Sequence, residues 1–465
     1  MASIPKQPLL ARRQFLTGCG LGLGNLALHG LLGEELAPKT PQFPPRARRI
    51  VQLFMGGAPS QFELFADKPE LARLEGKPIP PSVIGGQRYA FIRQDAAVLG
   101  PRFPFARHGQ SGIAVSSALP HLGKIVDRLC FVHSLHTDQF NHGPAQVLLQ
   151  TGSPQPGRPA LGSWALYGLG AETRDLPAFV VMSTGTGLSG GSALWSNGFL
   201  PAQYAGVRLR DQGPLILDVD SPAGVDRRVQ RESLDAIAAL NGMRVERDRD
   251  PELQARIAAY EMAFRLQVSA PELADLSTEP ASTLALYGCE PERPSFARAC
   301  LLARRLLERG VRCVTIFHEG WDAHSDVAGN VRTQAAATDR ASAALVIDLE
   351  RLGLLDDTLV IWGGEFGRTP MVETNPALGR SLGRDHHPQA FTMWLAGGGI
   401  RAGHQHGATD DLGFHVVQDP VHVHDLQATI LHCLGFDHER LTWRHAGRDY
   451  RLTDVHGRVV HELLA

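Results

Sequence analysis

The sequence predicts an α/β fold in which a doubly wound, mostly parallel sheet is flanked by helices. Short apolar runs indicate strands that are buried on both faces, and helical patterns lie between the later runs. Strands that alternate with helices are typical of parallel sheets, because each helix returns the chain to the edge where the next strand begins. The apolar runs are Arg49–Met55, Leu129–Leu135, Ala178–Met182, Val311–Phe317, Thr358–Trp362 and Phe391–Ala396.

The helical patterns suggest how the chain is organised around this sheet. They cover Pro251–Gln267, Ser295–Glu308 and Arg332–Arg351. The segment from about 201 to 290 is poor in strand signals and rich in charged residues, so we expect a helical insertion there, within a single α/β domain over residues 41–465. Open α/β sheets bind ligands at the carboxyl ends of their strands, so the polar residues that follow each apolar run are the candidates for a site.

The N-terminus has the pattern of a twin-arginine export signal. Arg12 and Arg13 precede a stretch rich in Gly, Leu and Ala at residues 18–32, which is too short and too glycine-rich to span a membrane. We therefore expect residues 1–40 to be a signal and linker. The mature chain would have no transmembrane segment and would be periplasmic or extracellular after passing through the twin-arginine export machinery.

Composition narrows the function further. The 46 basic and 48 acidic residues give a formal net charge of -2, which offers no electrostatic argument for a nucleic-acid partner. The six cysteines include no C-x-x-C pair, so no zinc-thiolate site or disulfide framework is predicted. Histidine is unusual, because 14 of its 20 copies lie at or after His318. This distribution favours a metal centre in the C-terminal half.

Two segments of that half supply candidate metal ligands. Asp322 and His324 follow the run that ends at Phe317, and their spacing lets both face one side of an extended loop. The alternative is an aspartate that caps a turn beside an exposed histidine. His386 and His387 precede another strand and cannot both point inward, so we expect His386 to be the ligand and His387 to lie behind it or in solvent. Carboxylate oxygen and imidazole nitrogen suit zinc, manganese or iron better than calcium.

A third segment combines glycines with two opposite charges. Glu365 and Arg368 follow the run that ends at Trp362, among glycines that would let the backbone approach a ligand. Arg368 could clamp an oxyanion through two hydrogen bonds, and the alternative is a salt bridge across a tight turn. No G-x-S-x-G, Walker or G-x-G-x-x-G motif occurs in a suitable context, which disfavours a serine hydrolase or a nucleotide-binding protein.

Several longer segments resemble an exported, sulfatase-like bacterial family known as domain of unknown function 1501. The resemblance implies an alkaline phosphatase/sulfatase-like fold and membership of the alkaline phosphatase superfamily. Members of that superfamily hold one or two metal ions at strand ends and attack phosphate or sulfate esters with Ser, Thr or a modified Cys. The segments are LFMGGAPSQFELF, NHGPA, GRPALGSWALYGLG, GWDAH, LLDDTLVIWGGEFGRTP, GRDHHP and VHDLQATILHCLG.

The resemblance also assigns residue roles. It places Glu365 at a metal-ligating carboxylate position, matches His386 to a ligand and makes Asp322 and His324 similar to the ligand pair of the phosphomutase branch. Phe366 stands where the superfamily often has a second ligand, and the first strand ends in Met55-Gly56-Gly57 in place of the usual Asp. These departures put a second metal site in doubt.

The nucleophile position differs as well. The alignment puts His142 at that position and Gln146 at the position of the arginine that follows it. Either His142 ligates metal or acts as the nucleophile, or Ser60 or Thr137 substitutes for it, or catalysis has been lost.

These observations together predict an exported hydrolase of phosphate or sulfate esters that uses one or two divalent ions on a small-molecule or polysaccharide substrate. The alternative is a non-catalytic cell-envelope protein that keeps the fold and binds a glycan or a partner. The expected metal ligands are Asp322, His324, Glu365 and His386; the expected catalytic residues are His142 and Arg368; and the additional candidates are Asn141, Asp385, His387 and His424.

Overall fold

The computed structural model describes residues 38–85, 92, 95–185, 188–210, 215–216, 225–248 and 251–465. Nearly all of the predicted export signal and linker lies outside these residues. In the part of the chain that is described, no helix combines the length and the apolar character needed to cross a membrane.

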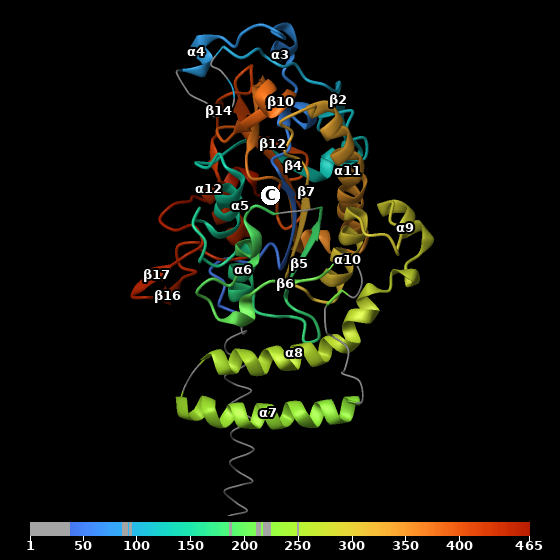
Figure 1. Ribbon diagram of the computed structural model, residues 1–465, viewed down its shortest axis with the longest axis vertical. Helices are drawn as coiled ribbons and strands as arrows, with labels where there is room; N and C mark the ends of the chain where they lie inside the picture. The colour runs from blue at the N-terminus through green and yellow to red at the C-terminus, as the bar shows by residue number, and fades with distance from the viewer. Residues whose placement is uncertain are drawn as a thin grey trace, which may run out of the picture.

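A nine-stranded sheet forms the centre of the molecule (Figure 1). In order across the sheet, its strands are β12 (His404–His406), β4 (Leu129–His136), β11 (Phe391–Ala396), β8 (Thr358–Gly363), β1 (Arg49–Gly56), β7 (Cys313–Glu319), β5 (Phe179–Thr184) and β6 (Val207–Arg208), and β15 (Val421–His422) also pairs with β4. All pairings are parallel except those of β11 with β4 and β8. The prediction of a mostly parallel α/β sheet is therefore confirmed.

Helices cover both faces of the sheet. One face packs against α10 (Phe296–Glu308) and α11 (Val327–Arg351), and the other packs against α5 (His142–Thr151), α6 (Leu161–Leu169) and α12 (Val423–Cys433) (Figure 1). Strand β1 shows why the predicted runs are almost continuously apolar. Val51 and Leu53 join the core on the α10 side, whereas Ile50 and Phe54 join the core on the α5 side.

The described residues between β6 and α10 are mainly helical. They form α7 (Arg227–Asp248), α8 (Pro251–Ala274) and α9 (Ala281–Tyr287). Helices α7 and α8 lie side by side at one end of the molecule, away from the end that carries β10 (Figure 1). The helix expected at Pro251–Gln267 is present and longer. The short strand β6 lies in the same charged region and was not predicted.

The ends of two helices follow from local capping. The side chain of Ser295 accepts a hydrogen bond from the backbone N–H of Arg298 and begins α10 at the predicted position. Helix α11 begins five residues before the predicted Arg332, because Asp326 caps it by accepting from the N–H of Gly329. The remaining described elements include α2 (Gln61–Leu64), α3 (Pro69–Arg73), α4 (Pro81–Ile84), β2 (Phe105–His108), β3 (Ile113–Ser116), β13 (Ala408–Thr409), β14 (Val416–Gln418), β16 (Trp443–His445) and β17 (Arg448–Tyr450).

A hairpin outside the main sheet contains two strands that the apolar runs did not predict. Strand β9 (Gly367–Asn375) pairs antiparallel with β10 (Arg380–His387), and the register sets His386 opposite Arg368. The sequence did not reveal these strands because β10 carries polar and ionisable side chains in place of an apolar run. Their burial depends on partners far away in the sequence, such as Glu63, which binds Arg384.

Candidate metal centre

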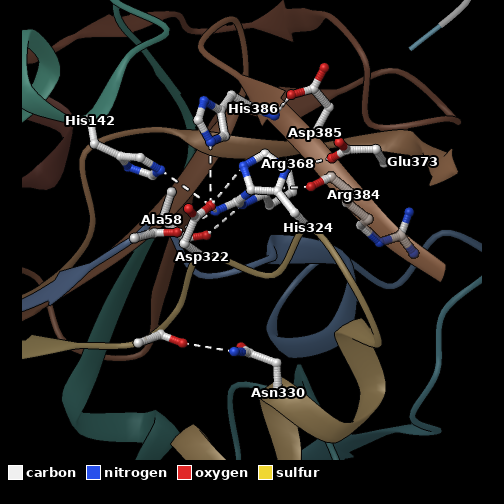
Figure 2. Close-up of polar contacts among 12 residues, drawn as sticks. Ala58, His142, Asp322, His324, Asn330, Arg368, Glu373, Arg384, Asp385 and His386 are labelled. Carbon is white, nitrogen blue, oxygen red and sulfur yellow. Dashed lines mark hydrogen bonds and ion pairs between the residues drawn. The ribbon is translucent and has the colours of Figure 1, made fainter. Parts of the chain in front are cut away.

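Four side chains from three separate segments converge on one point (Figure 2). Asp322 and His324 follow β7, His142 is the first residue of α5, and His386 lies near the end of β10. The Oδ1 atom of Asp322 lies 3.1 Å from Nε2 of His324, 3.2 Å from Nε2 of His142 and 3.4 Å from Nε2 of His386. Each residue offers one ligand atom, and the four atoms all lie within 4.8 Å of one another.

The other ring nitrogen of each histidine is held by an acceptor. Nδ1 of His142 lies 2.6 Å from Oε1 of Glu365, and Nδ1 of His324 lies 2.5 Å from Oε2 of Glu373. Nδ1 of His386 donates to the backbone carbonyl of Phe140 over 2.8 Å. Histidines that ligate metals in proteins typically donate their second N–H to a carboxylate or a backbone carbonyl, which fixes the tautomer and orients the ring.

His386 gives the clearest indication that a cation belongs here. A carbonyl can only accept, so Nδ1 of His386 carries a proton, and a neutral ring then has a lone pair on Nε2. Burial lowers the pKa of His386 to about 4, which keeps the ring neutral at pH 7. Its Nε2 therefore faces Oδ1 of Asp322 at 3.4 Å with no proton between two acceptors.

The charges around Asp322 also indicate a cation site. Burial alone would raise the pKa of its carboxyl, but the three histidines and Arg368 hold that pKa well below the usual range. Burial would lower the pKa of His142, but hydrogen bonds and charges from Asp322 and Glu365 raise it to about 9. A metal ion requires neutral imidazoles and would release that proton, so metal binding and protonation compete at His142.

The donor set fits a borderline divalent ion. Ligand atoms lie about 2.0–2.2 Å from zinc, so two ligands at tetrahedral angles are about 3.3–3.6 Å apart. The distances from Asp322 Oδ1 to the three nitrogens are close to that spacing. Nε2 of His142 is buried, and its polar contact is the one with Oδ1 of Asp322 at 3.2 Å. Magnesium and calcium prefer oxygen ligands, so three imidazoles favour zinc, manganese or iron.

One side of this cluster is accessible to solvent. The Asp322 side chain is 43% exposed, whereas those of His142, His324 and His386 are 16%, 12% and 9% exposed. The three histidine side chains are thus mostly buried, and solvent reaches the cluster beside Asp322.

Glu365 takes a different place from the predicted one. Its Oε1 accepts hydrogen bonds from Nδ1 of His142, from the Gln146 amide at 3.1 Å and from the N–H of Gly57 at 3.1 Å. It is not among the four converging atoms, because α5 places His142 between Glu365 and the point of convergence. Glu365 therefore orients a candidate ligand.

A Glu365→Gln variant tests this role. Glutamine keeps an acceptor for Nδ1 of His142 but loses the negative charge, so we expect metal affinity to fall about 10–100-fold, as for other residues that orient metal ligands. Competition with a chromogenic chelator measures the affinity. A Glu350→Gln variant, which loses only an exposed pair with Arg128, serves as the control. Unchanged affinity in Glu365→Gln would show that the carboxylate does not support the site.

Arg368 does not have the free guanidinium that an oxyanion clamp requires. The residue is fully buried. Its Nε donates to the carbonyl of Ala58 at 3.0 Å and its Nη1 to the carbonyl of Arg384 at 3.1 Å. Its Nη2 contacts the carbonyl of Gly57 and Oδ1 of Asp322, the latter at 2.6 Å. Arg368 thus fixes the position of Asp322, as Figure 2 shows.

The additional candidates lie around the cluster. Asn141 is exposed and precedes α5, and buried Asp385 accepts the backbone N–H of His386 at 2.8 Å. His387 is fully buried, where solvent exposure was one expectation, and its Nε2 lies 2.6 Å from the carbonyl of Phe414. His424 lies 3.1 Å from the carbonyl of Gly152 and is not among the converging atoms.

The proposed substitute nucleophiles differ in their surroundings. The hydroxyl of Ser60 is buried and bonded to Glu63, which removes it from the cluster. The hydroxyl of Thr137 is buried without a hydrogen-bond partner. His318, at the start of the histidine-rich half, contacts Thr184 and Gln334 and does not join the four converging residues.

Two residues near the cluster were not identified from the sequence. Glu373 on β9 binds His324 through one oxygen and Arg380 through the other, at 2.5 and 2.6 Å. Glu319 ends β7 and has a buried, unpartnered Oε1. Burial, together with the charge of Glu365, raises the pKa of Glu319 to about 7. Neither residue lies in a recognisable motif, so only the folded chain reveals them.

The fold and the site define an α/β protein with a histidine–carboxylate cluster of metal-ligand type at the carboxyl ends of its strands. The chain belongs to the family described as protein of unknown function DUF1501, whose model matches residues 47–464. A comparison with curated proteins found no match.

Distant similarity to solved structures is also present. A lipoteichoic acid synthase from Listeria monocytogenes aligns at 7% identity and a TM-score of 0.36, over 91% of this chain and 80% of that one. A sulfatase from Pseudoalteromonas sp. aligns at 12% identity and a TM-score of 0.35, over 90% of this chain and 72% of that one. A protein of the alkaline phosphatase superfamily from Vibrio parahaemolyticus aligns at 9% identity and a TM-score of 0.35, over 89% of this chain and 76% of that one.

Proposed function

We propose that the chain is a metal-dependent hydrolase of phosphate or sulfate esters, with one divalent ion held by His142, His324, His386 and Asp322. The proposal is based on the convergence of three Nε2 atoms on Oδ1 of Asp322, while the Nδ1 atom of each histidine is hydrogen-bonded to another acceptor. A divalent ion bound there would polarise an ester oxygen or lower the pKa of water.

The residues of the protein would bind the ion and orient its ligands. Glu365, Glu373 and the carbonyl of Phe140 keep the Nε2 lone pairs pointing inward, and Arg368 holds Asp322. Because its Nε2 faces the same point as the other two histidines, His142 is proposed as a ligand and not as the nucleophile.

One ion is proposed instead of two. A second group of potential ligands, His324, Glu373 and Asp385, shares His324 with the first. Glu373 in that group is already engaged by His324 and Arg380. A second ion bound there by Nδ1 of His324 would replace the hydrogen bond between His324 and Glu373.

A non-catalytic metal-binding protein is the second candidate. Two observations favour it: the guanidinium of Arg368 is committed to protein acceptors, and the hydroxyl of Ser60 is committed to Glu63. Neither residue is then available to stabilise or attack an ester.

Turnover assays separate the two candidates. We expect the purified protein to contain metal and to cleave an aryl phosphate or an aryl sulfate. Activity should disappear with a chelator and return with zinc or manganese. Metal without turnover on either ester would favour the non-catalytic candidate. Protein that neither contains nor takes up metal would contradict both candidates.

We also propose that residues 1–40 direct export through the twin-arginine machinery and that residues 41–465 form one α/β domain with a helical insertion at about 201–290. The Arg12-Arg13 pair before a short apolar stretch supports the export proposal. An Arg12→Lys/Arg13→Lys variant should accumulate inside the cell with its signal uncleaved. Unchanged export of that variant would contradict the proposal.

A further inference from the structure

A histidine caps the start of helix α12. The side chain of His422 accepts the backbone N–H of His424 through Nδ1, at 3.2 Å, and the side chain of Asp425 accepts the N–H of His422 at 3.0 Å. The capping residues of helices are usually Ser, Thr, Asp or Asn, whose oxygens remain acceptors in mild acid. An imidazole accepts through Nδ1 only while that nitrogen carries no proton. The cap of α12 therefore requires an uncharged His422.

Three further histidines form a chain of ring contacts with His422. The ring centroid of His422 lies 5.2 Å from that of His136, its register partner on β4, and 4.9 Å from that of His424. The ring of His456 stacks on that of His424 at 5.0 Å. A proton on one ring places a positive charge beside the next, so each protonated ring makes protonation of its neighbours less favourable.

Two carboxylates oppose this effect. Oδ2 of Asp138 lies 3.2 Å from Nε2 of His422, but the Asp138 side chain is 75% exposed, so solvent screens its charge. The carboxylate of Asp425 is shared with Arg458, whose backbone N–H donates to Oδ1 at 2.8 Å. Burial lowers the pKa of His422 despite both carboxylates. The neutral ring is therefore the stable form near pH 7.

The first two turns of α12 hold the end of helix α5. Nε2 of His424 donates to the carbonyl of Gly152, at 3.1 Å, where α5 ends. The amide of Gln427 donates to two carbonyls in the last turns of α5, each at 2.9 Å. Since α5 begins with the proposed ligand His142, the cap at His422 supports a helix that reaches the metal centre.

We propose that His422 is an acid-sensitive cap, which holds the first turn of α12 against the end of α5 only while its ring is neutral. A proton on Nδ1 would set two N–H groups against each other and would add a positive charge at a helix N-terminus, where the helix dipole disfavours it. The first turn of α12 then frays. The proposal does not depend on the hydrolase activity, because it concerns the folded chain alone.

The direction of the pH dependence follows from the lowered pKa of His422. The ordinary value is 6.5, and the value in the folded chain lies below it. Opening of the cap therefore becomes easier as the pH falls from about 6.5 towards the lowered pKa, because the opened ring binds a proton more readily than the capping ring. Above about pH 6.5 the cap is complete.

Hydrogen exchange of the full chain, measured by mass spectrometry between about pH 7.5 and about pH 4.5, tests the proposal, with rates corrected for the intrinsic effect of pH. We expect the protection of the amides in the first turn of α12 to fall about 5-fold in acid, as for the loss of a helix cap. Helix α10 is an internal control, because the hydroxyl of Ser295 caps it and does not titrate. Its first turn should stay protected at a pH where α12 has lost protection. Equal loss in both helices, or no loss in α12, overturns the proposal.

Variants assign the effect to His422. His422→Asn keeps a capping acceptor that does not titrate, so the first turn of α12 should keep its protection in acid. His422→Asp should behave in the same way. His445→Asn, which removes an exposed histidine on β16, should lose protection in acid as the wild type does. A loss of wild-type size in both variants at position 422, or no loss in His445→Asn, would overturn the proposal.

Discussion

Replacing His386 with alanine is expected to abolish stable metal binding. The side chain supplies one of the three nitrogens around Asp322, and its Nδ1 is anchored to the carbonyl of Phe140, so no neighbouring group is positioned to replace it. The loss of affinity should exceed the 10–100-fold typical of residues that only orient ligands. Metal content after gel filtration, measured by mass spectrometry, should fall from about one ion per chain to almost none.

The adjacent histidine is a matched control. His387 is buried and contacts the carbonyl of Phe414, away from the converging atoms. A His387→Gln variant should therefore retain its metal. Metal content that survives in His386→Ala, or that is lost equally in both variants, would contradict the assignment.

Replacing Arg384 with methionine is expected to destabilise the protein by about 3–5 kcal/mol. Arg384 and Glu63 are both fully buried and form an ion pair with a shortest distance of 2.7 Å. The guanidinium also donates to the carbonyls of Thr369, Leu99 and Gly100. Its removal leaves the Glu63 carboxylate buried without its cation. Urea unfolding measures the free-energy difference.

An exposed ion pair provides the comparison. Arg228 and Glu232 are one helical turn apart on α7, with side chains 73% and 61% exposed. Arg228→Met should cost less than about 0.5 kcal/mol. A double variant, Glu63→Gln with Arg384→Met, should recover part of the loss, because no charge is left unpaired. A loss below about 1 kcal/mol in Arg384→Met would mean that the pair does not hold β10 in place.

The main sheet was predictable because its strands carry their own signal. The apolar residues of β1 alternate between two apolar layers, with Val51 and Leu53 in one and Ile50 and Phe54 in the other. Apart from Gln52, residues 50–55 are therefore apolar, which makes the strand conspicuous in the sequence. Strand β10 lacks that signal. Most of its side chains are polar or ionisable, and an ion pair between Arg384 and Glu63, more than three hundred positions earlier, makes the burial of Arg384 possible.

The residues of the candidate site also include some that were predictable from the sequence and some that were not. Asp322, His324 and His386 follow or precede apolar runs, so their convergence could be expected from topology alone. The roles of Glu365 and Arg368 could not be predicted in this way, because each role depends on which groups lie next to the side chain in the folded protein. Helix α5 inserts His142 in front of Glu365, and three backbone carbonyls surround the guanidinium of Arg368.

Anomalous diffraction from crystals of the protein, collected on both sides of the absorption edges of zinc, manganese and iron, tests the central claim most directly. We expect one anomalous peak within bonding distance of Oδ1 of Asp322 and of Nε2 of His142, His324 and His386. A metal-bearing crystal with no peak between these four atoms, or with its peak elsewhere, would contradict it.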